Sequence, residues 1–144
     1  AERIAQANGA PVFVSSHLHE RSFGDLRGSR YDELGFDPMA ADYCPPNGES
    51  WLVFEARVAQ AFAEMVERSK ACQRSLVVVS HGLVIGRILH RHIIAANGVA
   101  LPTHLGNTAV TIFDAKPPHH ASLVGCMAHL EGAILDDGSG LSGF

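Results

Sequence analysis

The segment that most constrains the fold of this chain is Val77-Val78-Val79-Ser80-His81-Gly82. Its β-branched apolar run lacks alternation, which is typical of a strand covered on both faces, and an apolar helical pattern follows directly. In open α/β sheets, ligands bind beyond the carboxyl ends of the strands, where a helix N-terminus offers N–H groups to an anion. The segment therefore predicts a central strand and a phosphate-binding site formed by His81, Gly82 and Leu83. The alternative is a core histidine held by hydrogen bonds.

Periodicity and turn residues predict the other elements. Between residues 49 and 71, large apolar side chains recur at three- and four-residue spacing, which indicates a long amphipathic helix. Helices are expected over residues 1–8, 49–71 and 82–96, one helical turn over 31–34, and strands over 11–14, 75–80, 108–113 and 121–129. Strands and helices alternate in the middle of the chain, and a short Lys116-Pro117-Pro118 turn joins the last two strands. We therefore expect a three-layer α/β/α fold with a mostly parallel sheet and an antiparallel edge.

Length and composition limit the classes of protein to which the chain can belong. A chain of 144 residues can bury one substantial core, so we expect a single domain over residues 1–131 and a flexible tail over 132–144. The formal net charge of -4 disfavours nucleic acid as a partner, and no apolar stretch approaches the ~20 residues that cross a membrane. Three widely spaced cysteines without a CxxC pair favour a reducing, cytoplasmic setting.

The loop from Leu18 to Gly28 carries a second candidate site. Glu20 lies close to the apolar Leu18 in a long polar stretch that also contains Gly24. Long loops in compact domains tend to be functional, whereas glutamates in loops are usually solvated. Taken alone, this loop leaves both interpretations open.

Together, these segments resemble the histidine phosphatase (phosphoglycerate-mutase-like) superfamily in their order and spacing. Leu18-x-Glu20-x-x-Phe23-Gly24-x-x-x-Gly28 resembles its acid loop, Pro46-x-Gly48-Glu49-Ser50 with Phe54 and Arg57 resembles its Pro-Gly-Gly-Glu-Ser helix start, and Ser80-His81-Gly82 resembles its second histidine motif. Further matches are Ala1 to Ala5, Gly106-Asn107-Thr108 and Ala128-His129-Leu130. The resemblance covers nearly the whole chain.

That resemblance implies a phosphatase that passes a phosphoryl group to a histidine and then to water, without a metal ion or cofactor. Glu20 and His81 are the catalytic residues that it implies. Glu20 would protonate the leaving oxygen and later activate the water, while His81 would donate hydrogen bonds to the equatorial phosphoryl oxygens. Arg21 and Phe23 would contact the substrate, a small phosphorylated metabolite.

The chain departs from the family pattern at its beginning. The family's nucleophile belongs to an Arg-His-Gly motif on its first strand, before the point that matches Ala1, and no Arg-His-Gly occurs in this sequence. His90-Arg91-His92 lacks the glycine and lies at the far end of a predicted helix, so it does not replace the motif. The resemblance therefore implies a domain without its first strand and a polypeptide with negligible activity alone.

Several other functions stay open. Mutases of the family bind a substrate carboxylate through basic groups of an inserted segment, but residues 29–46 offer only Arg30, which favours a phosphatase over a phosphoglycerate mutase. A non-catalytic relic that binds a phosphorylated ligand or another protein chain is a further alternative, and a homodimer is compatible with the sequence. A metal site on His17-x-His19 or His119-His120 is also considered, although neither spacing matches a zinc signature.

Overall fold

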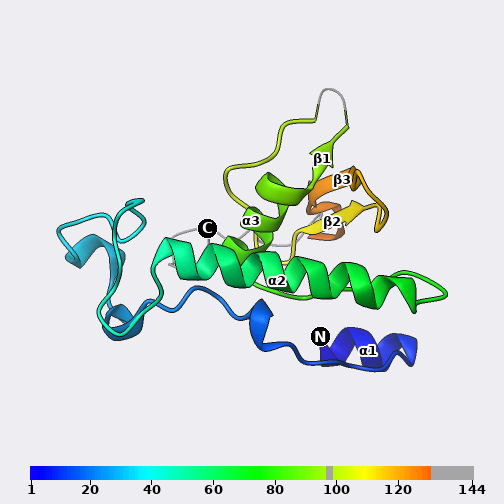
Figure 1. Cartoon of the computed structure of the whole chain (residues 1–144), viewed down its shortest axis with the longest axis horizontal. Helices are drawn as coiled ribbons and strands as arrows, with labels where there is room; N and C mark the ends of the chain where they lie inside the picture. Colours follow the sequence, from blue (N-terminus) through cyan, green and yellow to red (C-terminus); the bar gives the residue numbers. More distant parts are fainter. Residues whose placement is uncertain (97–98, 131–144) are drawn as a thin grey trace.

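The computed structural model describes residues 1–96 and 99–130, so the tail predicted over 132–144 lies outside the described residues. Three strands of this part form one sheet in the order β1-β3-β2: β1 (Ile94–Ala95), β2 (Val110–Phe113) and β3 (His120–Cys126). β1 pairs with β3 in parallel, and β2 pairs with β3 antiparallel. Three α-helices accompany the sheet: α1 (Glu2–Asn8), α2 (Trp51–Lys70) and α3 (Gly82–His92). The structure is thus a small α/β fold with a mixed sheet (Figure 1).

The long helix α2 lies between α1 and the rest of the fold (Figure 1). The Ser50 hydroxyl accepts a hydrogen bond from the N–H of Val53 at 3.3 Å and so caps its first turn. Arg68 and Lys70 lie in the last turn, where positive charge suits the helix dipole. In Figure 1, α3 and the sheet lie on one side of α2, and α1 lies on the other.

The core lies between α2, α3 and the sheet. Phe54 and Val84 are completely buried, and they belong to a cluster contributed by α2, α3, β3 and the adjoining loops. Its members are Phe54, Val58, Phe62, Val84, Ile88, Leu89, Ile93, Leu105 and Ala121. This packing fixes α3, and with it the candidate site at the start of α3.

Short 3-10 turns shape the loops between α1 and α2. α1 ends at Gly9, whose φ of 64 is the left-handed stop that Asn8-Gly9 predicts. The turns are η1 (Ser16–Leu18), η2 (Gly24–Leu26) and η3 (Tyr31–Glu33), the last where a helical turn was predicted. η1 ends where the acid loop begins and η2 lies within that loop, so Glu20 lies between the two turns.

Two segments predicted to be strands, residues 11–14 and 75–80, are not strands in the structure. Exposure nevertheless alternates along 75–80, where Val77 is 62% exposed while Val78 is half-buried. A strand requires backbone hydrogen bonds to a neighbour, and no described segment provides that neighbour. The sheet is therefore mixed rather than mostly parallel, and it does not include the predicted central strand.

The helix predicted over residues 82–96 is shorter than expected. It ends at His92, and Ile94 continues as β1, where its N–H donates to the carbonyl of His119 at 3.2 Å. β-branched residues favour the strand once such a partner is available. β2 falls inside its predicted range, β3 begins one residue before its own, and η4 (Ala128–Leu130) follows. No helix in the described part of the chain combines the length and apolar character needed to cross a bilayer.

Candidate active site

Glu20 and the start of α3 meet in space although 63 residues separate Glu20 from Leu83 in the sequence. One carboxylate oxygen of Glu20 accepts a hydrogen bond from the backbone N–H of Leu83 at 3.2 Å, and the other accepts from the N–H of Arg21 at 2.9 Å. Leu83 lies in the first turn of α3, whose N–H groups have no acceptor within the helix. Negative charge is also stabilised there by the helix dipole. The acid loop and the histidine motif thus meet at the start of α3.

His81 occupies the N-cap position of α3 with an extended backbone, and it is exposed. The preceding residue, Ser80, donates its hydroxyl to the carbonyl oxygen of Leu18 at 2.8 Å, which ties the histidine motif to the acid loop a second time. The residues predicted to bind phosphate therefore lie at a helix N-terminus, where the Glu20 carboxylate accepts a hydrogen bond from the N–H of Leu83.

An ion pair between Glu49 and Arg57 holds the acid loop, a role that sequence reasoning missed. Arg57 Nε donates to Glu49 Oε1 at 2.8 Å and Arg57 Nη2 to Glu49 Oε2 at 2.6 Å, which is a bidentate arrangement. The side chains of Arg57 and Glu49 are only 16% and 17% exposed. The hydrogen bonds from Arg57 keep the pKa of Glu49 below its usual range, although burial alone would raise it. The Glu49 carboxylate is therefore ionised at neutral pH.

Arg57 also binds the backbone of the acid loop directly. Its Nη1 donates to the carbonyls of His17 at 2.8 Å and His19 at 2.7 Å, and its Nη2 donates to the carbonyl of Glu20 at 3.3 Å. These bonds fix the backbone from which the Glu20 side chain extends. Arg57 follows the buried Phe54 by three residues, so the two side chains lie on one face of α2. An unpaired charge on that face would be costly, and this spacing could therefore have revealed that Arg57 needs an acidic partner.

Arg21 and Phe23, predicted to contact substrate, have partners inside the acid loop. Arg21 is 2% exposed, and its guanidinium carbon lies 5.3 Å from the centroid of the Phe23 ring. Burial is the main cause that lowers the pKa of Arg21. Its three hydrogen bonds all go to backbone carbonyls, those of Glu49 at 3.1 Å, Pro38 at 3.4 Å and Tyr43 at 2.8 Å. In this structure its donors join the acid loop to the following loop and are not directed at the start of α3.

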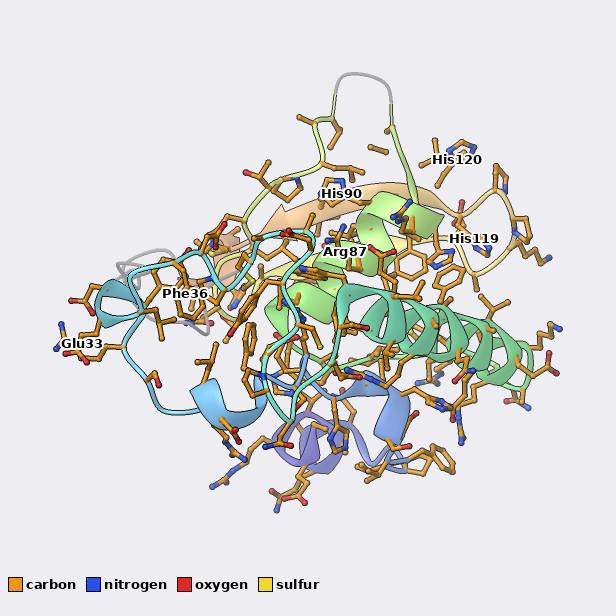
Figure 2. All side chains as sticks on the ribbon, turned by 60° about the vertical axis from the view of Figure 1, so that its left-hand side comes forward. Glu33, Phe36, Arg87, His90, His119 and His120 are labelled. Carbon is orange, nitrogen blue, oxygen red and sulfur yellow. The ribbon has the colours of Figure 1, made fainter. Side chains whose placement is uncertain are left out.

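A cavity of about 400 Å³ opens along the first turns of α3. Leu83, Arg87 and His90 contribute to its helical wall, and residues of the loop over 31–39 and of the segment 102–105 lie across from them. Figure 2 shows Arg87 and His90 on α3. The volume falls within the ~300–1,000 Å³ usual for small-molecule sites, and the cavity includes the predicted phosphate-binding residues Gly82 and Leu83.

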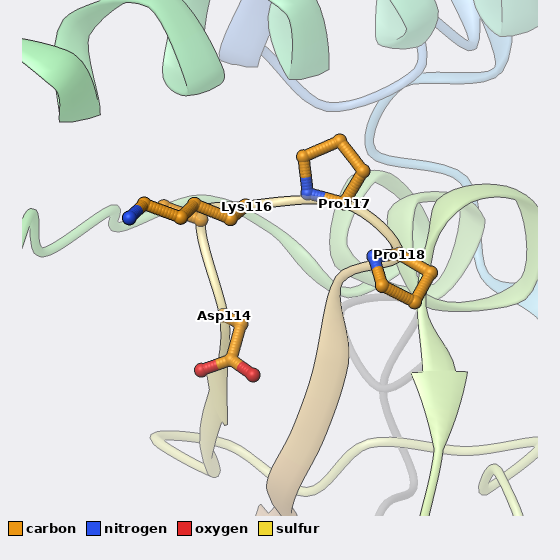
Figure 3. A pocket seen from close by; sticks show the side chains of 5 residues that line it. Asp114, Lys116, Pro117 and Pro118 are labelled. Carbon is orange, nitrogen blue, oxygen red and sulfur yellow. The ribbon is translucent and has the colours of Figure 1, made fainter.

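A second cavity, of about 480 Å³, lies at the turn that follows β2, between Asp114 and Pro118 (Figure 3). None of the predicted site residues lines it. Two of the histidines considered as metal ligands have other neighbours: Nδ1 of His17 lies 3.5 Å from a carboxylate oxygen of Glu64, and Nδ1 of His119 lies 3.0 Å from the carbonyl of Asp114. Within residues 1–96 and 99–130, no three or more His, Cys, Asp or Glu side chains are grouped to hold a metal ion.

The fold and the site define an α/β protein in which a loop carboxylate meets the N-terminus of a helix that follows a His-Gly pair. The model of the histidine phosphatase superfamily (branch 1) matches residues 1–124. The chain therefore belongs to the histidine phosphatase superfamily, which includes both phosphatases and mutases. No curated protein and no solved structure matched the chain.

Proposed function

We propose that the domain to which this chain contributes hydrolyses phosphate monoesters of small metabolites through a phosphohistidine intermediate. The observation that supports this most is the hydrogen bond from the N–H of Leu83 to Glu20. This bond brings together the Glu20 carboxyl group, which can transfer a proton, and the N-terminus of α3, which can bind an anion. In this proposal the phosphoryl oxygens bind at His81, Gly82 and Leu83, and Glu20 protonates the leaving oxygen.

The same hydrogen bond suggests how Glu20 acts. A bound phosphate ester would take the N–H of Leu83 as a donor, and the carboxyl group would then turn to the ester oxygen. Proton transfer requires donor and acceptor atoms within about 2.6–3.2 Å of each other. The Glu20 carboxyl group could come this close to the ester oxygen, because its Oε2 already lies 3.2 Å from the backbone nitrogen of Leu83, which would bind a phosphoryl oxygen.

The nucleophile of the proposed reaction is a histidine on an Arg-His-Gly strand upstream of Ala1, following the superfamily pattern. Exposed apolar side chains support an additional strand: Val14 is 87% exposed, Phe13 65% and Val77 62%. A strand paired with these segments would cover such side chains and use the free backbone donors and acceptors. That strand would also complete the mostly parallel, layered sheet that the sequence predicts.

Hydrolysis is favoured over mutase activity by the loop between the acid loop and α2. Arg30 is the basic residue available there for a substrate carboxylate, and it is already engaged. Its Nη2 pairs with Asp32 at 2.7 Å, and its Nε lies 3.3 Å from Glu33. We therefore propose that the phosphoryl group is transferred to water rather than to a second hydroxyl group of the substrate.

Turnover of p-nitrophenyl phosphate in the presence of EDTA tests this function. The 144-residue chain should be inactive, because Glu20 and His81 cannot catalyse the reaction when the histidine that forms the covalent intermediate is absent. The same chain extended upstream through an Arg-His-Gly strand should be active, and His81→Ala should abolish that activity. Robust turnover by the shorter chain that His81→Ala removes would mean that the nucleophile lies within residues 1–144 and that the proposal is wrong.

A further inference from the structure

We propose that His92 and His119 form, together with Phe62, a pH-sensitive joint that holds the C-terminal end of α3 against the turn over residues 114–119 and opens on acidification. This histidine joint lies at the opposite end of α3 from the candidate active site. None of its three residues belongs to that site, so the inference does not depend on the proposed function.

The two histidine rings of the joint contact the same buried phenylalanine. Phe62 lies on α2 and is 7% exposed. The ring of His92, the last residue of α3, stacks on the Phe62 ring with 4.2 Å between centroids and 7° between planes. The ring of His119 meets Phe62 edge-on, at 5.0 Å and 86°. Figure 2 shows His119 directed toward the helices, whereas the adjacent His120 points away from them. One apolar ring thus connects a helix end with a turn that is distant in the sequence.

The surroundings of His92 suit a neutral ring. α2 and β2 present the apolar rings of Phe62 and Phe113, whose centroids lie 6.4 Å apart. The charged groups that act on His92 are both bases, namely His119 from the turn and Arg91 from its own helix. A proton on His92 would therefore add positive charge beside positive charge, on a half-buried ring.

Two attractions would favour a charged His92, and the structure weakens both. The C-terminus of a helix favours a cation, but Arg91 already supplies one in the same turn of α3. A cation is also attracted to the face of an aromatic ring, most strongly to that of Trp, but here the ring is a Phe that is already buried. Burial, and then His119 and Arg91, lower the pKa of His92.

His119 also holds the first hydrogen bond between β1 and the turn. Its carbonyl accepts from the N–H of Ile94 at 3.2 Å, and its own N–H donates to the carbonyl of Lys116 at 3.0 Å. Its φ of 60 is uncommon for a residue other than glycine, and such a backbone persists only while its contacts hold it. β1 has only two residues, so a displaced His119 would release β1 from β3.

The direction of the pH effect follows from the lowered pKa. The unfolded chain takes up the proton before the folded chain does. The stability that the neutral joint contributes is therefore present above the unfolded value of about 6.5 and is lost as the pH falls through the folded value of His92.

An NMR titration of the unaltered 144-residue chain from about pH 8 to about pH 5 tests the joint without any substitution. The ring resonances of His92 and Phe62 and the amide resonance of Ile94 are followed together. We expect His92 to titrate below about 6.5, and the resonances of Phe62 and Ile94 to shift with the same midpoint. A His92 that titrates at or above this value, or an Ile94 amide that does not follow it, would overturn the proposal.

A matched pair of variants tests the part of the turn. His119→Asn removes the neighbouring base, and Asn tolerates a positive φ, so the pKa of His92 should rise. His120→Asn makes the same change at the adjacent exposed position and should leave the titration of His92 unchanged. Equal effects of the two variants on His92 would contradict the joint.

His92→Phe keeps an aromatic ring on Phe62 but cannot be protonated. Its urea midpoint should match that of the unaltered chain at about pH 8 and should fall less on acidification to about pH 5. A midpoint at about pH 8 near that of the unaltered chain would also show that the variant is folded. An equal fall in the two chains would overturn the proposal. None of these measurements involves phosphate, so their outcome leaves the proposed function unaffected.

Discussion

Replacing Arg57 with alanine should destabilise the chain far more than replacing a surface arginine of the same helix. The substitution removes the two hydrogen bonds to Glu49 and those to the carbonyls of His17, His19 and Glu20. It also leaves the Glu49 carboxylate, only 17% exposed, without its guanidinium partner. Removing one partner of a buried ion pair costs about 3–5 kcal/mol, and because this pair keeps some contact with water we expect about 3 kcal/mol.

Urea unfolding followed by far-UV circular dichroism measures this loss. Arg68→Ala is the control, because Arg68 pairs with Glu64 on α2 at 3.1 Å but is 42% exposed. Such a surface pair contributes about 0–1 kcal/mol. In Arg57→Ala the amide resonance of Leu83 should also shift, because a displaced acid loop no longer holds the Glu20 carboxylate at α3. Equal losses of stability in the two variants, with the Leu83 resonance unchanged, would refute the positioning role of Arg57.

Two further predictions concern the same loop. Because the folded pKa of Glu49 is lowered, its contribution to stability is present above its unfolded pKa of about 4.3 and is lost as the pH falls through the folded value. Urea midpoints measured between neutral and acidic pH should therefore fall less steeply in Glu49→Gln, and parallel curves would contradict this. Gly24→Ala should cost more than about 2 kcal/mol, because Gly24 has a φ of 52 and a Cβ would overlap the carbonyl oxygen of Pro46. Gly28→Ala, with a φ of 87 but no atom within 4 Å of the added Cβ, should cost only about 1 kcal/mol in thermal unfolding, and equal costs would argue against the close approach.

The helices were predictable because their signals are local. The apolar residues from Trp51 onward recur on one helix face, which is enough to predict α2. Ser50 is a favourable N-cap residue whatever α2 packs against. The start of α3 at His81-Gly82 is likewise encoded by adjacent residues. The end of α3 is not encoded locally, because Ile94 belongs to β1, where its N–H donates to the carbonyl of His119, which is distant in the sequence.

Strands and long-range contacts were harder to predict, because they depend on partners distant in the sequence. Residues 75–80 have the composition of a buried strand, but composition cannot supply the neighbour that pairs with it. The motif around Glu20 indicated an acid, yet nothing local shows that its carboxylate accepts from Leu83. Arg21 is a similar case: its type suggested an anion ligand, whereas three backbone carbonyls take its donors.

The central claim is that Glu20 transfers a proton to a leaving group bound at the start of α3. Its most direct test compares phenyl phosphate with p-nitrophenyl phosphate in the chain extended through an Arg-His-Gly strand, with and without Glu20→Gln. p-Nitrophenolate leaves readily without a proton, whereas phenolate needs one. Glu20→Gln should therefore slow phenyl phosphate hydrolysis by about 10²–10⁴-fold and p-nitrophenyl phosphate hydrolysis much less. An equal loss on both substrates, or no loss on either, would contradict the assignment of Glu20 as the general acid.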